Sequence, residues 1–139
     1  MRFIDANVFL YALIKPKREL SHSEQTVKKQ ARKILESLDS NGKVLTTTVH
    51  ISEVFNILES HSTYDYTFEV AERLLFNDNI IIESVNKENY RISLLMAKKH
   101  NISINDALAV FFMRNNKVKE IYSFDKHFDN IEDIKRVVD

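Results

Sequence analysis

Five short apolar segments recur along this chain, and the sequence between them is mainly helical in character. The apolar segments have the length and composition of strands, and they lie at residues 2–5, 44–47, 80–83, 120–123 and 135–138. Helix-like segments lie at residues 7–14, 21–41, 48–60, 66–76, 87–100 and 104–115. Strands that alternate with single or paired helices are typical of a parallel sheet covered on both faces. The sequence therefore predicts an α/β fold in which a parallel five-stranded sheet is flanked by helices.

Local signals predict where some of these elements begin and end. Pro16 ends the first helix, because the residue before a proline disfavours the α conformation. Ser21-His22-Ser23-Glu24 fits a capping box that opens the longest helix, and Asn41-Gly42 is expected to end it. The run Ile80-Ile81-Ile82 is the clearest buried strand of the chain. Three aromatic side chains are expected either at a dimer interface or in the core, with the core favoured: Tyr64, Tyr66 and Phe68.

Composition narrows the class of protein. The 139 residues are the usual size of one domain, and we expect a single domain over residues 1–139. The 20 lysine and arginine residues balance the 20 aspartate and glutamate residues. To bind a nucleic acid, the protein would therefore need its positive charges gathered in patches. The absence of cysteine excludes disulfides, thiolate zinc sites and cysteine nucleophiles. The single glycine disfavours the glycine-rich phosphate loops of dinucleotide-binding and P-loop proteins.

The cellular location is predicted from two features that the sequence lacks. No apolar stretch approaches the roughly 20 residues that a membrane span needs. Asp5 and Asn7 interrupt the first apolar run and no basic segment precedes it, so a secretory signal is not predicted. We expect a cytoplasmic protein with no membrane association.

Four acidic residues stand at or just beyond the junctions between strands and helices. Asp5 ends the first predicted strand and Asp125 follows the fourth, while Glu53 and Asp106 lie on helices. Parallel strands bring their carboxyl ends to one edge of a sheet, where ligands bind. Carboxylates gathered there would repel one another unless a cation held them. Oxygen ligands without soft donors suit Mg²⁺ or Mn²⁺, so the sequence predicts a divalent metal site.

Each acid also has a simpler interpretation. Asp5 and Asp125 are suited to N-cap positions, and Asp106 completes a capping pattern with Ser103. Glu53 on its own would be an ordinary exposed helix residue. The joint placement of all four at one edge of a sheet is what favours the metal site.

The histidines and basic residues give weaker signals. The five histidines have no metal-binding spacing and are interpreted as surface or packing residues: His22, His50, His61, His100 and His127. Basic clusters occur at residues 15–18, 28–33 and 114–119. The first is the best candidate for contact with a phosphate backbone, because it follows the helix that leaves Asp5.

Four short motifs together resemble the PIN domain, and most of all the small single-domain proteins of the VapC toxin type. The motifs are Phe3-Ile4-Asp5-Ala6-Asn7-Val8, Ile51-Ser52-Glu53-Val54, Ile104-Asn105-Asp106-Ala107-Leu108 and Ser123-Phe124-Asp125-Lys126-His127-Phe128-Asp129. They occur in the family's order, and the resemblance extends from Phe3 to about Val137. It implies a three-layer α/β/α sandwich and a metal-dependent endoribonuclease that hydrolyses RNA phosphodiester bonds.

The resemblance also implies roles for particular residues and partners. The metal ligands and catalytic residues would be Asp5, Glu53, Asp106 and Asp125, holding one or two Mg²⁺ or Mn²⁺ ions. Asn7 stands where the family often has Thr or Ser, and we expect Asn7 and Ser123 to orient water or phosphate. Proteins of this type commonly form homodimers and are neutralised by a small antitoxin, which implies the toxin of a type II toxin–antitoxin pair.

Three other functions are compatible with parts of this pattern. A PIN-domain nuclease can process cellular RNA without an antitoxin. A non-catalytic RNA-binding module on the same fold would typically lose one or more acids, whereas this chain keeps all four. A receiver-type signalling domain needs a phosphate-accepting Asp at the end of a middle strand, whereas the run Ile80-Ile81-Ile82 ends in Glu83.

Overall fold

The computed structural model describes residues 1–40 and 42–139. Its centre is a parallel sheet with strand order β3-β2-β1-β4-β5. The strands are β1 (Arg2–Ile4), β2 (Val44–Thr47), β3 (Ile80–Glu83), β4 (Glu120–Tyr122) and β5 (Lys135–Val137). The helices are α1 (Ala6–Leu13), α2 (His22–Ser37), α3 (Thr48–His61), α4 (Tyr64–Leu75), α5 (Lys87–His100), α6 (Ile104–Asn115) and the 3₁₀ helix η1 (Lys126–Asn130). The predicted fold with five parallel strands is confirmed.

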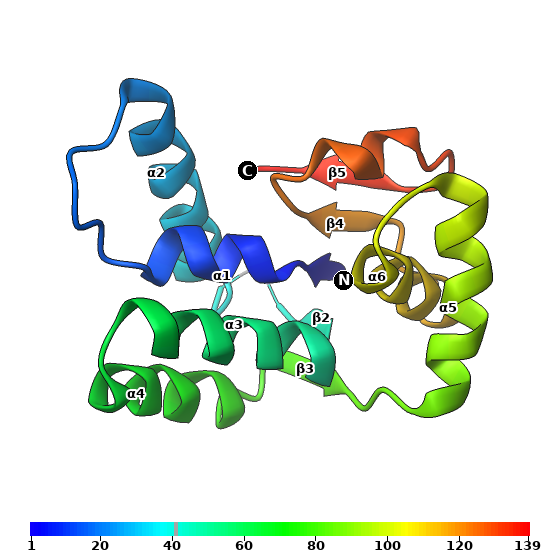
Figure 1. Ribbon diagram of the computed structural model, residues 1–139, viewed down its shortest axis with the longest axis horizontal. Coiled ribbons are helices and arrows are strands. Elements are labelled where there is room, and N and C mark those ends of the chain that lie inside the picture. The colour runs from blue at the N-terminus through cyan, green and yellow to red at the C-terminus, as the bar shows by residue number, and fades with distance from the viewer. Residues whose placement is uncertain (41) are drawn as a thin grey trace.

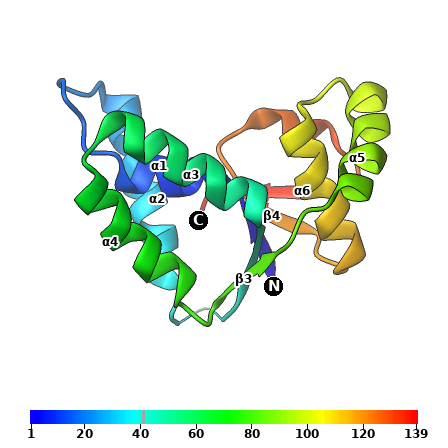
Figure 2. The same ribbon diagram turned by 60° about the horizontal axis from the view of Figure 1, so that its bottom comes forward.

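Helices cover both faces of the sheet. Helices α1 to α4 lie on one side and α5 and α6 on the other (Figure 1). Figure 2 shows the sheet between these two groups, so the fold is the three-layer α/β/α sandwich that the resemblance implied. None of the helices in the described part of the chain combines the length and apolar character needed to cross a membrane.

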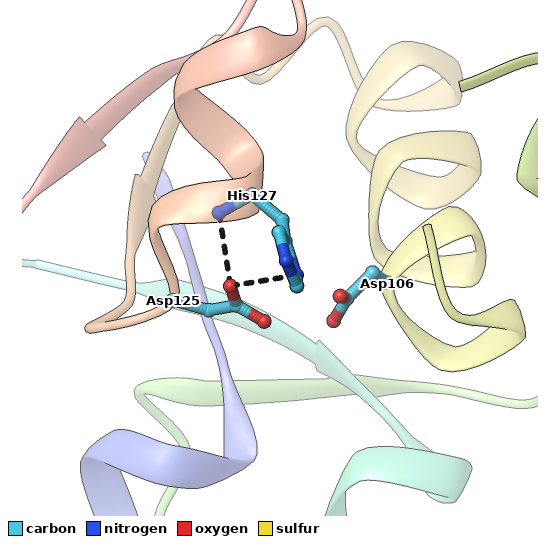
Figure 3. Close-up of side chains that lie close together, drawn as sticks. All are labelled: Asp106, Asp125 and His127. Atoms are coloured by element: carbon cyan, nitrogen blue, oxygen red, sulfur yellow. Dashed lines mark hydrogen bonds and ion pairs between the residues drawn. The ribbon is translucent and has the colours of Figure 1, made fainter. Parts of the chain in front are cut away.

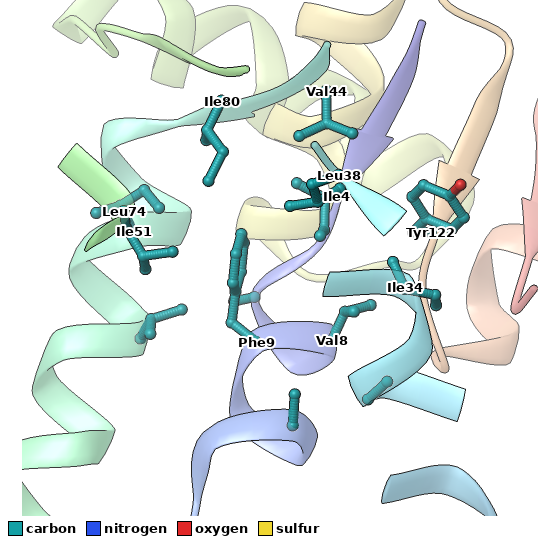
Figure 4. Close-up of a cluster of buried hydrophobic side chains, with 14 of the residues drawn as sticks. Ile4, Val8, Phe9, Ile34, Leu38, Val44, Ile51, Leu74, Ile80 and Tyr122 are labelled. Atoms are coloured by element: carbon teal, nitrogen blue, oxygen red, sulfur yellow. The ribbon is translucent and has the colours of Figure 1, made fainter. Parts of the chain in front are cut away.

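Two hydrophobic cores lie on opposite faces of the sheet, because successive side chains of a strand point to opposite faces. Ile4 and Tyr122 pack with residues of α1, α2 and α3 in the core that Figure 4 shows. Phe3 and Ile121 pack with residues of α6 in the other core. A shift of β1 by one residue would exchange these side chains between the cores, so the strand register is strongly specified. This register fixes the position of Asp5 at the end of β1.

The order of the strands reverses between β1 and β4. From β1 the chain runs outward to β2 and β3, and it then returns to β4 and β5 on the other side of β1. Such a reversal leaves a crevice beyond the carboxyl ends of the two strands, which is where open α/β sheets bind ligands. The backbone N–H of Asp5 donates to the carbonyl of Tyr122 at 3.0 Å, so the ends of β1 and β4 stay side by side.

Most predicted boundaries agree with the structure to within two residues, but the longest helix is an exception. Helix α2 begins with the predicted capping box of Ser21 and Glu24. It ends at Ser37, so its predicted continuation to Asn41-Gly42 was wrong. The Ser37 hydroxyl donates to a backbone carbonyl within the last turn, a local bond that competes with further helix. Gly42 has φ +86°, which suits the expected turn, and Asn41 lies outside the described residues.

The run Ile80-Ile81-Ile82 forms a strand as predicted, but its predicted burial was wrong. β3 is an edge strand, and only Ile80 is buried. An apolar run does not by itself distinguish an edge strand from a central one.

Two of the three aromatic residues of α4 that were expected in the core lie outside it, whereas Tyr66 packs against the core as predicted. Tyr64 and Phe68 are 66% and 56% exposed, and their rings stack on the outer face of α4 with centroids 6.1 Å apart. Residues four apart share a helix face, and this face points to solvent. Tyr66 is partly buried, and its hydroxyl donates to a carbonyl at the end of α1 at 2.7 Å.

Candidate metal centre

Asp5 directly follows β1, and its side chain is almost fully buried, with 6% of the residue exposed. Its Oδ1 accepts a hydrogen bond from the backbone N–H of Ala6 at 2.9 Å and so caps α1. Its Oδ2 accepts a hydrogen bond from Ser123 Oγ at 2.7 Å. The simpler interpretation of Asp5 as an N-cap is therefore correct, yet the same carboxylate also lines the cavity described below.

Ser123 connects the segments that follow β1 and β4. Its Oγ donates to Asp5, and it accepts hydrogen bonds from Asn7 Nδ2 at 3.3 Å and from the backbone N–H of Asp125 at 3.0 Å. Asn7 Oδ1 accepts in turn from the backbone N–H of Phe124 at 3.3 Å. One buried hydroxyl thus uses its donor and both acceptor positions to hold two acids in a fixed relation.

Replacing Ser123 by alanine is expected to lower the free energy of unfolding by about 1–3 kcal/mol, because Asp5 loses a hydrogen-bond donor in a buried position. Ser93→Ala is the matched control. Ser93 is also fully buried, but its hydroxyl has no hydrogen-bond partner among the described residues. Urea unfolding followed by circular dichroism measures both variants. Equal losses would contradict the connecting role of Ser123.

Asp106, Asp125 and His127 face one another across the crevice, as Figure 3 shows. Asp106 lies in the first turn of α6, where its backbone N–H donates to the N-cap Ser103 at 3.0 Å. Asp125 is the N-cap of η1, and its Oδ1 lies 2.9 Å from the backbone N of His127 and 3.1 Å from His127 Nδ1. One ligand atom from each of the three side chains lies within 4.8 Å of the others. This spacing is compatible with one shared cation.

A cavity of about 570 Å³ brings all four predicted acids together. Glu53 reaches it from the second turn of α3. The cavity is lined by Asp5, Asn7, Leu10, Glu53, Asn101, Ile102, Ser103, Ile104, Asn105, Asp106, Asp125 and His127. Among these described residues there is no lysine or arginine to balance the four carboxylates. A donor set of carboxylate, amide and imidazole groups fits a hard divalent cation such as Mg²⁺ or Mn²⁺.

The pKa values of three carboxyls in the cavity, those of Asp5, Glu53 and Asp106, are raised. Burial raises the pKa of Asp5 to about 7, with a smaller contribution from the nearby charge of Asp106, against the hydrogen bond from Ser123. Burial and the charge of Asp125 raise the pKa of Asp106 to about 6. Burial also raises the pKa of Glu53. A site in which several carboxyls resist ionisation has the electrostatic character that a bound cation would relieve.

Two histidines lie next to the acids, which sequence reasoning did not predict. His127 is exposed and His50 is 1% exposed, so both fit the predicted classes of surface and packing residue. Burial lowers the pKa of His50 to about 4, so its ring is neutral at pH 7 and its 3.9 Å approach to Asp5 is not an ion pair. Its Nδ1 lies 2.6 Å from Thr47 Oγ1. The sequence position of each histidine was the signal that could have revealed them. His50 follows Thr47, the last residue of β2, by three residues, and His127 follows Asp125 by two.

The remaining charged groups lie beside the cavity or away from it. Asp129 pairs with Arg136, at 3.0 Å between Oδ1 and Nε, and does not line the cavity. The basic segment at residues 15–18 lines a second cavity of about 530 Å³, which shares Leu10 with the first. Lys28 lines that second cavity too, but its amine is bonded to carbonyls at the end of α1. The basic segment is therefore near enough to meet a polymer that crosses the acidic cavity.

The middle strand of the sheet leads to an aspartate, as a receiver-type domain would require, but this aspartate is not suited to accept phosphate. The middle strand of the sheet is β1, not the run at residues 80–82, and β1 does precede an aspartate. Asp5 is nevertheless a poor phosphate acceptor, because it is buried and both its oxygens accept hydrogen bonds.

Comparison with known proteins identifies the family of this chain. The profile of the PIN domain matches residues 2–134. The structure of VapC20 from Mycobacterium tuberculosis, described as a Sarcin-Ricin loop cleaving toxin, is similar with a TM-score of 0.71 and 18% identity over 90% of each chain. A toxin–antitoxin complex from Klebsiella pneumoniae is similar with a TM-score of 0.70 and 11% identity, over 97% of this chain and 96% of that chain. FitAcB from Neisseria gonorrhoeae is similar with a TM-score of 0.60 and 15% identity, over 98% of this chain and 96% of that chain. No curated protein matches the sequence.

The profile match spans nearly the whole chain, and the chain therefore belongs to the PIN domain family. The resemblance inferred from the four short motifs is confirmed. At 11–18% identity the solved structures add agreement of the fold, whereas the chemistry of this chain has to be argued from its own residues.

Proposed function

We propose that residues 1–139 form a single nuclease domain that hydrolyses RNA phosphodiester bonds with the help of Mg²⁺ or Mn²⁺. The observation that carries the proposal is the cavity at the switch between β1 and β4, where four carboxylates meet and the described lining residues include no lysine or arginine. Membership of the PIN domain family and the likeness to a protein described as a Sarcin-Ricin loop cleaving toxin support the reaction class.

The residues proposed to hold the metal are Asp5, Glu53, Asp106 and Asp125. The ion would supply Lewis acidity toward water and phosphate oxygens. Asn7 and Ser123 would keep the two strand-end acids in place, since they already bond to both segments. Asn7 also lines the cavity and would orient water or phosphate. Ser123 was expected to share that role, but it is fully buried, its hydroxyl is fully bonded, and it does not line the cavity, so it would act only through Asp5 and Asp125. His127 would add a further nitrogen at the rim of the cavity. Single-stranded or looped RNA is the favoured substrate, because side chains cannot read the narrow major groove of an A-form helix.

The proposed partners are a second copy of this chain and a small antitoxin, as in a type II toxin–antitoxin pair. Two of the structurally similar proteins are a toxin and a toxin–antitoxin complex, which supports this assignment. The exposed rings of Tyr64 and Phe68 on α4 offer apolar surface for a protein contact. A small neighbouring gene for a DNA-binding protein would support the toxin over a nuclease that works without an antitoxin.

Cleavage of pooled RNA by the purified protein is expected with Mg²⁺ or Mn²⁺ and is expected to stop with excess EDTA. The reason is that the carboxylates alone repel an RNA phosphate. Adding Mn²⁺ back after EDTA is expected to restore cleavage. Gel electrophoresis of end-labelled RNA measures it. Folded protein that binds RNA without cutting it in any of these metals would favour the non-catalytic module.

A further inference from the structure

We propose that a groove beside the acidic cavity binds one nucleobase of the RNA, next to the phosphate that is cleaved. The groove encloses about 410 Å³ and is lined by Thr48, Val49, Ser52, Glu53, Asn56, Ile57, Tyr90 and Asn105. This inference rests on the proposed function for its substrate class, and it assigns an additional binding site with its own residues.

The groove and the acidic cavity are neighbours that share two lining residues. Glu53 on α3 and Asn105 on α6 belong to both. A chain whose phosphate lies among the acids can therefore place an adjacent unit in the groove. The volume is within the range of about 300–1,000 Å³ typical of small-ligand pockets.

The chemistry of the groove fits an uncharged aromatic ligand. Among its lining residues Glu53 is the only charged one, so the part of a nucleotide that enters is the base and not the phosphate. Tyr90 is 40% exposed and presents a ring on which a base can stack. The amides of Asn56 and Asn105 offer both donors and acceptors for the polar edge of a base. Aromatic stacking combined with edge hydrogen bonds is how proteins recognise splayed single-stranded RNA.

The groove is preformed by bonds that fix its walls. The backbone N–H of Val85 donates to Thr48 Oγ1 at 3.1 Å and ties the segment before α5 to the start of α3. Asn86 and Asn89 form a reciprocal capping box at the start of α5, with both bonds at 2.9 Å. Tyr90 follows directly and its backbone N–H donates to Asn86 at 3.3 Å. A wall set before binding avoids part of the ordering cost of recognition.

Binding of RNA hexamers to an inactive parent tests the groove directly. The probes are four fluorescein-labelled hexaribonucleotides of A, C, G or U, titrated with Asp106→Asn protein in Mg²⁺ and followed by fluorescence anisotropy. Adding Tyr90→Ala is expected to weaken the best-bound probe about tenfold, the effect of losing one base stack. Tyr90→Phe keeps the ring and is expected to bind within about twofold of the parent. Asn56→Ala is expected to change the order of preference among the four probes.

Phe76→Ala is the control, because Phe76 is an aromatic side chain that is 83% exposed and does not line the groove. The proposal is overturned if Tyr90→Ala binds like the parent, if Phe76→Ala loses as much, or if the parent binds none of the probes. Cleavage by the wild-type protein is measured separately. If the protein cleaves RNA and Tyr90→Ala leaves the KM unchanged, the groove does not bind a base but the proposed nuclease function stands. If binding depends on Tyr90 and no RNA is cleaved, the groove binds a base but the proposed nuclease function is wrong.

Discussion

Replacing Asp106 by asparagine is expected to reduce RNA cleavage by at least about 10³-fold while the protein stays folded. Asparagine keeps the size of the side chain and the backbone bond to Ser103, but it removes a negative charge from the cluster with Asp125. The pKa of Asp106 is raised to about 6 by burial and by Asp125, so the metal-free variant is expected to be as stable as the wild type or more stable at pH 7.5. Loss of activity with unchanged or higher thermal stability separates the chemical role from a structural one.

Asp65→Asn is the matched control for this variant. Asp65 is also an acid in the first turn of a helix, but it is exposed on α4 and does not line the acidic cavity. Its replacement is expected to change kcat/KM by less than about twofold, since surface charges away from special features have small effects. If the Asp106→Asn variant cleaves RNA as fast as the wild type, or if the Asp65→Asn variant loses as much activity, Asp106 does not belong to the proposed active site.

The parallel sheet made part of the acidic cluster predictable, but not Asp106, because α6 follows the helix α5 and not a strand. Every strand of such a sheet ends at the same edge, so acids that directly follow strands lie along that edge. Asp5 and Asp125 could therefore be assigned to one edge from the sequence, and the structure adds that β1 and β4 are neighbours. Their role as helix caps was equally readable, and the structure shows that a carboxylate can cap a helix and line a cavity at once.

Features that depend on tertiary context were missed. The isoleucines of β3 have the composition of a central strand, but position in the sheet is decided by how the helices connect, not by the run itself. Tyr64 and Phe68 lie on a helix face that no other element covers among the described residues, which the apolar content of α4 does not reveal. His50 enters the site from the helix after β2, and its sequence spacing from Asp5 carries no information about that approach.

Without divalent metal, the protein is expected to lose stability as the pH rises from 5 to 8. Burial raises the pKa of Asp5 from 3.8 to about 7, so the folded state keeps a proton that the unfolded state releases. The free energy of unfolding then falls as the pH rises from the pKa of the unfolded state to that of the folded state, by on the order of 2–4 kcal/mol. The raised pKa of Asp106 acts in the same direction up to about pH 6. The lowered pKa of His50 opposes it between about pH 4 and 6.5, so the net fall is close to that from Asp5 alone.

Thermal unfolding in EDTA and in Mn²⁺ at pH 5 and pH 8 measures this effect. The midpoint in EDTA is expected to be lower at pH 8 by at least about 5 °C. Mn²⁺ is expected to recover more at pH 8 than at pH 5, because a cation binds the ionised carboxylates and competes with the protons. Asp5→Asn is expected to remove most of the pH dependence in EDTA, since the proton that links folding to pH is then absent. A midpoint in EDTA that is unchanged or higher at pH 8 would mean that Asp5 is already ionised in the folded protein, and that the electrostatic demand for a cation is smaller than its burial implies.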